Sequence, residues 1–199
     1  ARVINNVSGD NQRLIANGIG VFSRSPLGSA QGLKITAKAF DIPLGGHRPF
    51  AALAYDENYN PVSVDPTSIR WNVDPALGSF DGNVFTAAKT GIGTVTASLG
   101  NIKATQTIRV LKETTTLSIE PQKLRVLPES KASLEVYATD KAGFTAPVDP
   151  LDLGWEISGD FGTIIGGDFV AGSGGNGVAI ASFAGKTAGA LIEGGYVRQ

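Results

Sequence analysis

The strongest constraint on the fold of this chain is an internal repeat with an offset of 84 residues. The paired positions, which share residue type and spacing, are Asp56 and Asp140, Asp65 and Asp149, Trp71 and Trp155, Gly78 and Gly162, and Gly91 and Gly175. Units of ordinary solenoid proteins are only roughly 20–50 residues long, so a repeat of this length indicates one whole domain present twice. The sequence therefore predicts two copies of one domain, at residues 31–112 and 113–199, with a short, stiff connection at residues 112–116.

Alternation of apolar and polar residues is the main local pattern within each copy. In residues 105–110, Ile108 and Val110 fall on one face and Thr107 and Arg109 on the other, which is the period of a half-buried strand. Turn-forming clusters separate such runs at residues 45–46, 56–61, 81–83 and 100–101. Short strands at this spacing predict an all-β fold, as a β-sandwich or barrel.

Composition excludes several classes of protein. The chain has 42% hydrophobic residues, enough to bury a core, which argues against general disorder. With 17 basic and 18 acidic residues it has no basic excess, so we expect no nucleic-acid partner. The absence of cysteine excludes disulfides, thiol nucleophiles and Cys-ligated metal sites. No apolar run approaches the roughly 20 residues of a membrane-spanning helix, so we expect no membrane insertion.

The beginning of the chain indicates a fragment. It does not start with Met, and it lacks the positively charged start and apolar run of a signal peptide. We therefore expect that it is a cut or processed piece of a longer product.

The first copy resembles a bacterial immunoglobulin-like domain of the invasin-type group (group 2), common in cell-surface proteins. The residues that carry the resemblance are 69–71, 77–80, 82–87 and 91–97. The second copy keeps Trp155, Gly162 and residues 169–171 and 177–181, while its Ala- and Gly-rich end at residues 184–195 departs from the pattern. The resemblance implies two tandem immunoglobulin-like β-sandwiches, preceded by a short extended arm, in a secreted or cell-surface bacterial protein.

Residues 1–25 resemble a different family. Residues 3–10 and 13–22 are similar to the closing stretch of a bacterial phosphodiester glycosidase domain, related to the enzyme that uncovers mannose 6-phosphate by removing N-acetylglucosamine. Immunoglobulin-like modules often follow the catalytic domain in the bacterial versions. The resemblance implies that residues 1–30 are the tail of an upstream catalytic domain. The family's Gly-rich catalytic motifs are absent from this sequence, so it implies an enzyme as the parent and not an active fragment.

Two aromatic residues are candidates for binding. Tyr59 and Phe144 lie in corresponding turns of the two copies, at the ends of the expected sandwiches. Loops on a rigid scaffold often carry recognition, and aromatic faces suit sugars. We interpret the pair as a candidate site for cell-wall or host polysaccharide, with packing over a neighbouring strand as the alternative.

One acidic turn is a candidate for calcium, the only cofactor that the sequence suggests. Asp56, Glu57, Asn58 and Asn60 offer several oxygen ligands, which is how calcium is held. The turn lacks the spacing and terminal Glu of an EF-hand loop, and the second copy has Asp-Lys-Ala-Gly at residues 140–143. A plain acidic turn is therefore the alternative.

Other conspicuous residues have structural interpretations. Trp71 and Trp155 occupy the same place in both copies, which favours core residues over sugar-stacking platforms. Asp65 and Asp149 each precede a proline and are predicted to start turns. His47 is the only histidine; its Gly-Gly-His-Arg-Pro sequence predicts a solvated loop residue.

Three hypotheses for function follow. The chain is a non-catalytic spacer or anchoring module, a carbohydrate-binding or adhesion module for the parent enzyme, or itself a hydrolase of phosphodiester-linked sugars. Hydrolysis needs paired carboxylates or an activated nucleophile. Because no such arrangement is found in the sequence, we expect that this chain is not an enzyme.

Overall fold

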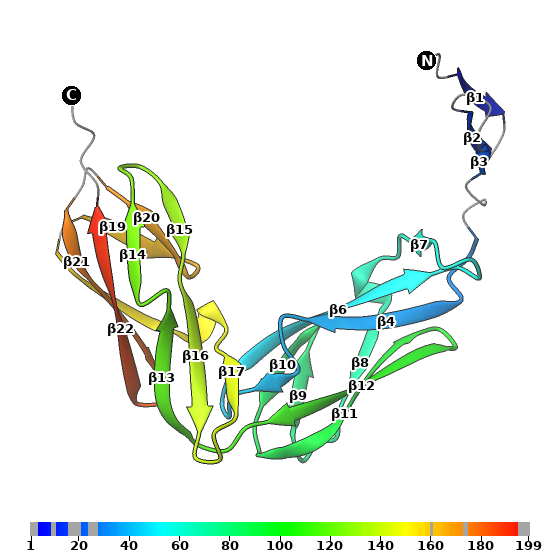
Figure 1. Cartoon of the computed structure of the whole chain (residues 1–199). Coiled ribbons are helices and arrows are strands. Elements are labelled where there is room, and N and C mark those ends of the chain that lie inside the picture. Colours follow the sequence, from blue (N-terminus) through cyan, green and yellow to red (C-terminus); the bar gives the residue numbers. More distant parts are fainter. Residues whose placement is uncertain are drawn as a thin grey trace.

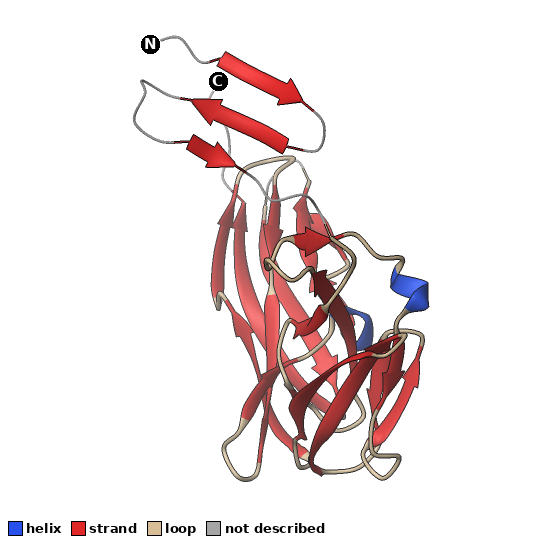
Figure 2. Cartoon of the chain, turned by 90° about the vertical axis from the view of Figure 1, so that its right-hand side faces the viewer, coloured by secondary structure: helices blue, strands red, loops and turns tan. Residues whose placement is uncertain are grey.

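A computed structural model describes residues 4–8, 11–15, 21–23, 28–159, 161–172 and 175–194 of the chain. The regular structure of these residues consists of strands and two short 3-10 turns (Figures 1 and 2). The side chains are described from residue 28 onward, within the same limits. Three bodies of strands follow one another along the chain: a small sheet and two sandwiches.

The first sandwich has the strand order of an immunoglobulin fold. Its elements are β4 (Gly32–Ala37), β5 (Asp41–Ile42), β6 (His47–Tyr55), β7 (Pro61–Val62), η1 (Pro66–Ser68), β8 (Arg70–Asn72), β9 (Gly78–Asp81), β10 (Val84–Ala87), β11 (Gly91–Leu99) and β12 (Ile102–Val110). One sheet has the order β4-β6-β10-β9, with β7 added to β6, and the other has the order β5-β12-β11-β8. These are the two sheets of an immunoglobulin domain, with β5 running parallel to β12.

The second sandwich repeats this arrangement. Its elements are β13 (Thr114–Glu120), β14 (Lys123–Val126), β15 (Lys131–Ser133), β16 (Glu135–Asp140), β17 (Thr145–Pro147), η2 (Pro150–Asp152), β18 (Gly154–Ser158), β19 (Gly162–Ile165), β20 (Asp168–Ala171), β21 (Asn176–Phe183) and β22 (Lys186–Gly194). The sheet β14-β22-β21-β18 matches β5-β12-β11-β8 of the first copy. The counterpart of β6 is divided into β15 and β16, which belong to two smaller sheets. The Ala- and Gly-rich end forms β22, so it keeps its place in the fold.

Each sandwich has its own hydrophobic core. Phe50, at 1% exposure, is the centre of the first core and contacts four aromatic rings: Phe40, Trp71, Phe80 and Phe85. The second core contains Phe161 and Phe169, and Trp155 packs against it. Both tryptophans therefore lie against cores, as their repeated position predicts. The prediction of an all-β chain with two tandem immunoglobulin-like sandwiches is confirmed.

The repeated Asp-Pro sequences start the two 3-10 turns. The side chain of Asp65 accepts the N–H of Thr67 at 2.9 Å, and that of Asp149 accepts the N–H of Leu151 at 3.1 Å. An aspartate that caps a turn satisfies an amide that would otherwise lack a partner. The prediction that these residues start turns is therefore correct in both copies.

The N-terminal arm contains a three-stranded antiparallel sheet formed by β1 (Ile4–Ser8), β2 (Asn11–Ile15) and β3 (Val21–Ser23). Ile4 pairs with Ile15, and Leu14 pairs with Phe22. The resemblance of residues 1–25 to a glycosidase falls partly outside the described residues.

Deletion of residues 1–25 is expected to leave both sandwiches folded. The described core residues of the two sandwiches all lie at or beyond Ala30, and this deletion keeps Gly28 and its contact with Asp56. Thermal unfolding followed by circular dichroism measures the result. A truncated chain that loses cooperative unfolding would show that the arm belongs to the first sandwich.

Candidate functional site at the joint between the sandwiches

The two sandwiches meet end to end, with β17 of the second lying against β5 of the first (Figure 1). The connection between β12 and β13 consists of residues 111–113. Polar and charged side chains from both sandwiches converge at this joint.

Arg48 is the centre of the joint. It is the second residue of β6, on the same face as Phe50, and it is fully buried at 0% exposure. Its Nη2 donates a hydrogen bond to the carbonyl oxygen of Pro147 at the end of β17. Burial lowers the pKa of Arg48, while the negative charges of Asp149 and Asp152 act in the opposite direction. The buried guanidinium, with its hydrogen-bond acceptor on the other sandwich, indicates that the joint is closed to water around Arg48.

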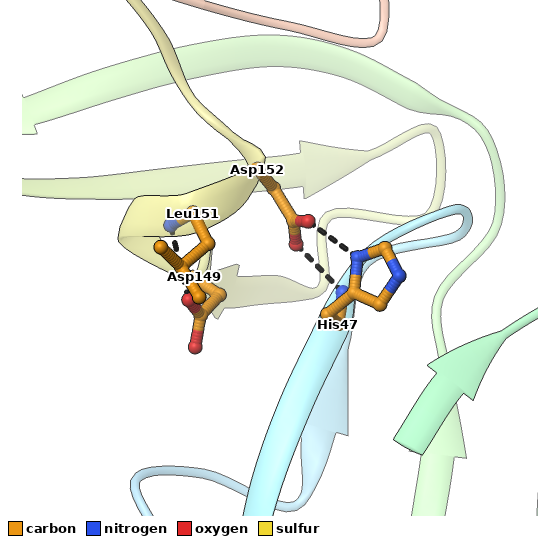
Figure 3. Close-up of polar contacts among 4 residues, drawn as sticks. All are labelled: His47, Asp149, Leu151 and Asp152. Carbon is orange, nitrogen blue, oxygen red and sulfur yellow. Dashed lines mark hydrogen bonds and ion pairs between the residues drawn. The ribbon is translucent and has the colours of Figure 1, made fainter. Parts of the chain in front are cut away.

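His47 makes two contacts with one carboxylate across the joint (Figure 3). Its Nδ1 lies 2.5 Å from Oδ1 of Asp152, and its backbone N–H donates to Oδ2 of the same residue at 2.6 Å. Asp152 is held in place because it ends η2, the turn that Asp149 caps. The predicted loop position is wrong, because His47 begins β6 and has a partner 105 positions further along the chain, in the other copy. Its side chain is nevertheless 45% exposed, so the predicted contact with solvent is correct.

Two further contacts lie at the edge of the joint. Lys38 Nζ lies 2.7 Å from Oε1 of Glu135, and Oε2 of the same carboxylate accepts the hydroxyl of Tyr137 at 2.6 Å. These two hydrogen bonds, that of Lys38 first, lower the pKa of Glu135. The guanidinium of Arg109 lies 4.1 Å from the centre of the Phe144 ring. Exposed pairs of this kind contribute about 1 kcal/mol or less each, so the buried Arg48 is the main contact of the joint.

The connection itself is held by a buried carboxylate. Oδ2 of Asp140 accepts the backbone N–H of Lys112 at 3.0 Å, while Oδ1 accepts the N–H groups of Ala142 and Phe144. Burial raises the pKa of Asp140, but these N–H groups outweigh it, and the pKa lies below its ordinary value. The N–H of Leu111 also donates to the carbonyl oxygen of Ile42. Successive residues of the connection are thus fixed to both sandwiches.

A shallow apolar cleft of about 250 Å³ lies beside the connection. Its lining includes Ile92, Arg109 and Leu111 from the first sandwich and its exit, and Phe144 from the second. Phe144 is 46% exposed, and one part of its ring faces Arg109. The structure therefore places this predicted binding residue at the joint.

Tyr59 lies at the opposite end of the first sandwich, in the loop that follows β6. It is 81% exposed, and its ring stacks on that of Tyr55 with 5.4 Å between centroids. The structure does not bring Tyr59 and Phe144 together. A shared polysaccharide site would have to extend from one end of a sandwich to the other.

The candidate calcium residues form a loop organised around one buried carboxylate. Asp56 is 1% exposed, and its Oδ1 accepts the N–H groups of Asn58 and Asn60, both at 2.9 Å. Its Oδ2 accepts the side-chain amide of Asn60 at 3.0 Å and the N–H of Gly28 at 3.1 Å. Both oxygens therefore face donors, which supports a role in shaping the turn. Glu57 and Asn58 are exposed.

Calcium binding at this loop stays a prediction that calorimetric titration can test. If the native chain releases or absorbs heat on calcium binding and the Asp56→Asn, Glu57→Gln double variant does not, a calcium ion is assigned to residues 56–60. An identical, flat titration of both proteins would leave Asp56 with the turn alone. Across the described ranges, no group of three His, Asp or Glu side chains is arranged to hold a metal ion.

Acid is expected to weaken the Asp56 loop. The donors around Asp56, the side-chain amide of Asn60 first, lower its pKa to about 2, compared with about 3.9 in an unfolded chain. A carboxyl with a lowered pKa in the folded state stabilises the fold above its unfolded pKa, and this stabilisation is lost as the pH falls from about 4 to about 2. Thermal unfolding between pH 5 and pH 2 should show a steeper loss in the native chain than in the Asp56→Asn variant. Parallel curves would contradict this assignment.

Comparisons with known proteins find similarity only among solved structures. No family model matches the chain, and no curated protein matches it. Among solved structures, domains 4 and 5 of the S-layer protein SbsC give a TM-score of 0.39 at 14% identity, covering 84% of this chain and 99% of that fragment. The Yersinia pseudotuberculosis adhesin InvE gives a TM-score of 0.33 at 16% identity, covering 81% of this chain and 58% of the adhesin chain. A fragment of intimin, solved with the intimin-binding domain of its receptor Tir, gives a TM-score of 0.32 at 14% identity. The match covers 80% of this chain and 62% of that fragment.

The chain spans about a third of the longer SbsC fragments that it matches. The assignment of immunoglobulin-like sandwiches rests on the strand order and the two cores of the chain itself. No helix in the described ranges is both long and apolar enough to span a bilayer.

The residues of the joint were not found from the sequence. Arg48, Asp152, Lys38 and Glu135 belong to no motif, and their partners lie in the other copy. The one available signal was the repeat, which pairs Asp140 with Asp56. A carboxylate kept in both copies indicates a structural contact that both copies need, here with Lys112 and Gly28.

Proposed function

We propose that this chain is a non-catalytic spacer module that holds two immunoglobulin-like sandwiches in one fixed orientation. The observation that carries the proposal is the burial of Arg48 between the sandwiches, where its guanidinium donates to the carbonyl oxygen of Pro147 in the second sandwich. Separation of the sandwiches would expose the guanidinium and break its hydrogen bond to Pro147. A joint of this kind resists bending, whereas a Gly- or Ser-rich linker would permit it.

Residual dipolar couplings of the backbone amides test the fixed orientation. We expect that couplings from residues 32–110 and 114–194 fit a single alignment tensor. Two tensors of different magnitude would show that the sandwiches reorient independently, and would contradict a rigid spacer.

The setting of the spacer is a bacterial cell surface or the exterior. This part of the proposal is supported by the resemblance of residues 69–97 to invasin-type immunoglobulin-like domains. We further propose that the parent protein is a phosphodiester glycosidase, supported by the resemblance of residues 1–25. We expect that a longer form of the protein hydrolyses a phosphodiester-linked N-acetylglucosamine and that residues 28–199 alone do not. A longer form without this activity would remove the glycosidase from the proposal.

Carbohydrate binding is the second candidate, favoured by the exposed ring of Tyr59. Retention of the chain on insoluble cell-wall polysaccharides, compared with a Tyr59→Ala, Phe144→Ala variant, tests it. Saturable retention that the variant loses would make the chain a targeting module. Retention that is absent, or that the variant keeps, would remove these two residues as its binding site.

A further inference from the structure

Strand β6 has a gap in its backbone pairing on the side of β7 and β10. Its register pairs with β10 end at Pro49, and its pairs with β7 begin at Ala54. Between them, the N–H of Phe50 donates to the carbonyl oxygen of Asn83, and the carbonyl oxygen of Phe50 accepts the side-chain amide of Asn83. Alternate residues of an antiparallel strand direct their backbone groups to the same side, so those of Ala52 point into the gap.

The second copy closes the corresponding gap with a backbone hydrogen bond. There the N–H of Val148 donates to the carbonyl oxygen of Val136 at 2.8 Å. The repeat offset of 84 residues places Ala52 and Val64 at these two positions of the first copy. In the described part of the first copy, no such bond joins Ala52 and Val64. The first copy therefore leaves open a backbone contact that the second copy makes.

A cavity of about 220 Å³ lies at this gap, between β6 and the η1 turn. Its lining includes Ala52, Val64, Pro66, Trp71 and Asn83. Trp71 is half-buried, so part of its indole forms a wall of the cavity. The cavity is smaller than the roughly 300–1,000 Å³ of sites for drug-sized ligands, so it suits a single ring with one substituent.

Two differences in sequence between the copies make this room. Ala52 takes the place of Val136, a larger residue that is 2% exposed in the second core. Asn83 takes the place of Gly167, where an added Cβ would lie only 3.2 Å from the ring of Pro150. The turn of the second copy therefore lies against its proline, whereas in the first copy the turn and the proline line a cavity. Because the second copy fills this place, the fold itself does not require the cavity.

We infer that this cavity binds an N-acetylated sugar residue. The acetamido group has one N–H donor and one carbonyl acceptor, so it can complete the backbone pairing of Ala52, as Val148 does for Val136 in the second copy. The indole of Trp71 gives the C–H groups of the sugar ring an apolar surface. A peptide strand does not fit here, because β7 and β10 occupy the adjoining lengths of β6 on both sides of the gap.

This site is separate from the features on which the proposed function depends. It needs neither the fixed joint nor the rings of Tyr59 and Phe144, neither of which lines the cavity. Failure of this inference and failure of the proposed function are therefore distinguishable.

Titration of the native chain with N-acetylglucosamine, followed by NMR spectra of the N–H groups, tests the site. Saturable shifts are expected for the backbone N–H groups of Ala52 and Val64 and for the indole N–H of Trp71. The equivalent groups of the second copy should not shift. Glucose, which lacks the acetamido group, should bind about tenfold more weakly or less, because it leaves the backbone of Ala52 without an amide partner.

The matched variant is Ala52→Val, which gives the first copy the residue that fills the second. Its larger side chain should occupy the cavity and abolish the saturable shifts, while the first sandwich stays folded as the second does with valine. Val136→Ala, the reverse change in the second copy, should leave binding at Trp71 unchanged. The Tyr59→Ala, Phe144→Ala variant should also bind N-acetylglucosamine as the native chain does.

Several results would overturn the inference. Absence of a saturable shift at Ala52 in the native chain would leave the gap to solvent, and equal affinity for glucose would exclude a role of the acetamido group. Binding that persists in a folded Ala52→Val variant would place the sugar elsewhere. If that variant does not fold, the contrast between N-acetylglucosamine and glucose on the native chain decides. Saturation by N-acetylalanine methylamide, but not by N-acetylglucosamine, would assign the cavity to a peptide and overturn the sugar.

Discussion

An Arg48→Ala variant is expected to lose the fixed orientation of the two sandwiches while each sandwich stays folded. The change removes a fully buried guanidinium and its hydrogen bond to the carbonyl oxygen of Pro147 in the second sandwich. Loss of a hydrogen bond from a charged donor costs about 1.5–3 kcal/mol. That free energy belongs to the joint, so the loss should appear as independent alignment of the sandwiches.

The control for this variant is Arg70→Ala, because Arg70 is an exposed arginine in β8, away from the joint. It should leave a single alignment tensor. A second comparison, Asp149→Asn with Asp152→Asn in one chain, removes the counter-charges and keeps the cap of η2. If Arg48→Ala kept the native orientation, the backbone contacts of residues 111–113 would be enough to hold the joint, and Arg48 would not be its centre.

A Phe50→Ala variant is expected to destabilise the first sandwich by about 3–5 kcal/mol. Phe50 is 1% exposed and its ring lies 5.6–6.5 Å from those of Phe40, Trp71, Phe80 and Phe85. A cavity at this point removes contacts to all four neighbours at once, and rings held by backbone strands cannot move far to fill it. Urea unfolding followed by Trp71 fluorescence in a Trp155→Phe background measures the effect.

The matched variant in the second core is Phe169→Ala, at a residue of 0% exposure. It should lower the stability reported by Trp155, in a Trp71→Phe background, and leave the Trp71 transition nearly unchanged. A decrease in the free energy of unfolding of less than about 1 kcal/mol in Phe50→Ala would mean that neighbouring side chains of the first core move to fill the cavity. Equal losses from both reporters for either variant would mean that the two cores unfold as one unit.

The fold was predictable because its signals are local or repeated. Strand alternation depends on neighbouring residues, and the positions of Trp71 and Trp155 follow from two copies of one pattern. The caps at Asp65 and Asp149 are also local, since each aspartate bonds an amide two residues away.

The joint was not predictable because its contacts link residues about a hundred positions apart. Alternation along β6 places Arg48 on the same face as Phe50. The sequence pattern does not indicate which residues of the second sandwich cover this charged side chain. The burial of Arg48 depends on β17 and η2, which the chain places there only after both sandwiches fold. The contact of His47 with Asp152 was unpredictable for the same reason, because the two residues lie 105 positions apart.

The pairing of β5 with β12 has a mechanical consequence. The two strands run parallel near the point where the chain leaves the first sandwich, so tension along the chain loads their hydrogen bonds in shear. Two register pairs form this patch in the first sandwich, whereas the corresponding patch of β14 and β22 has four. Under a pulling force the first sandwich should therefore yield before the second, which makes it the first of the two to lengthen when the chain is stretched.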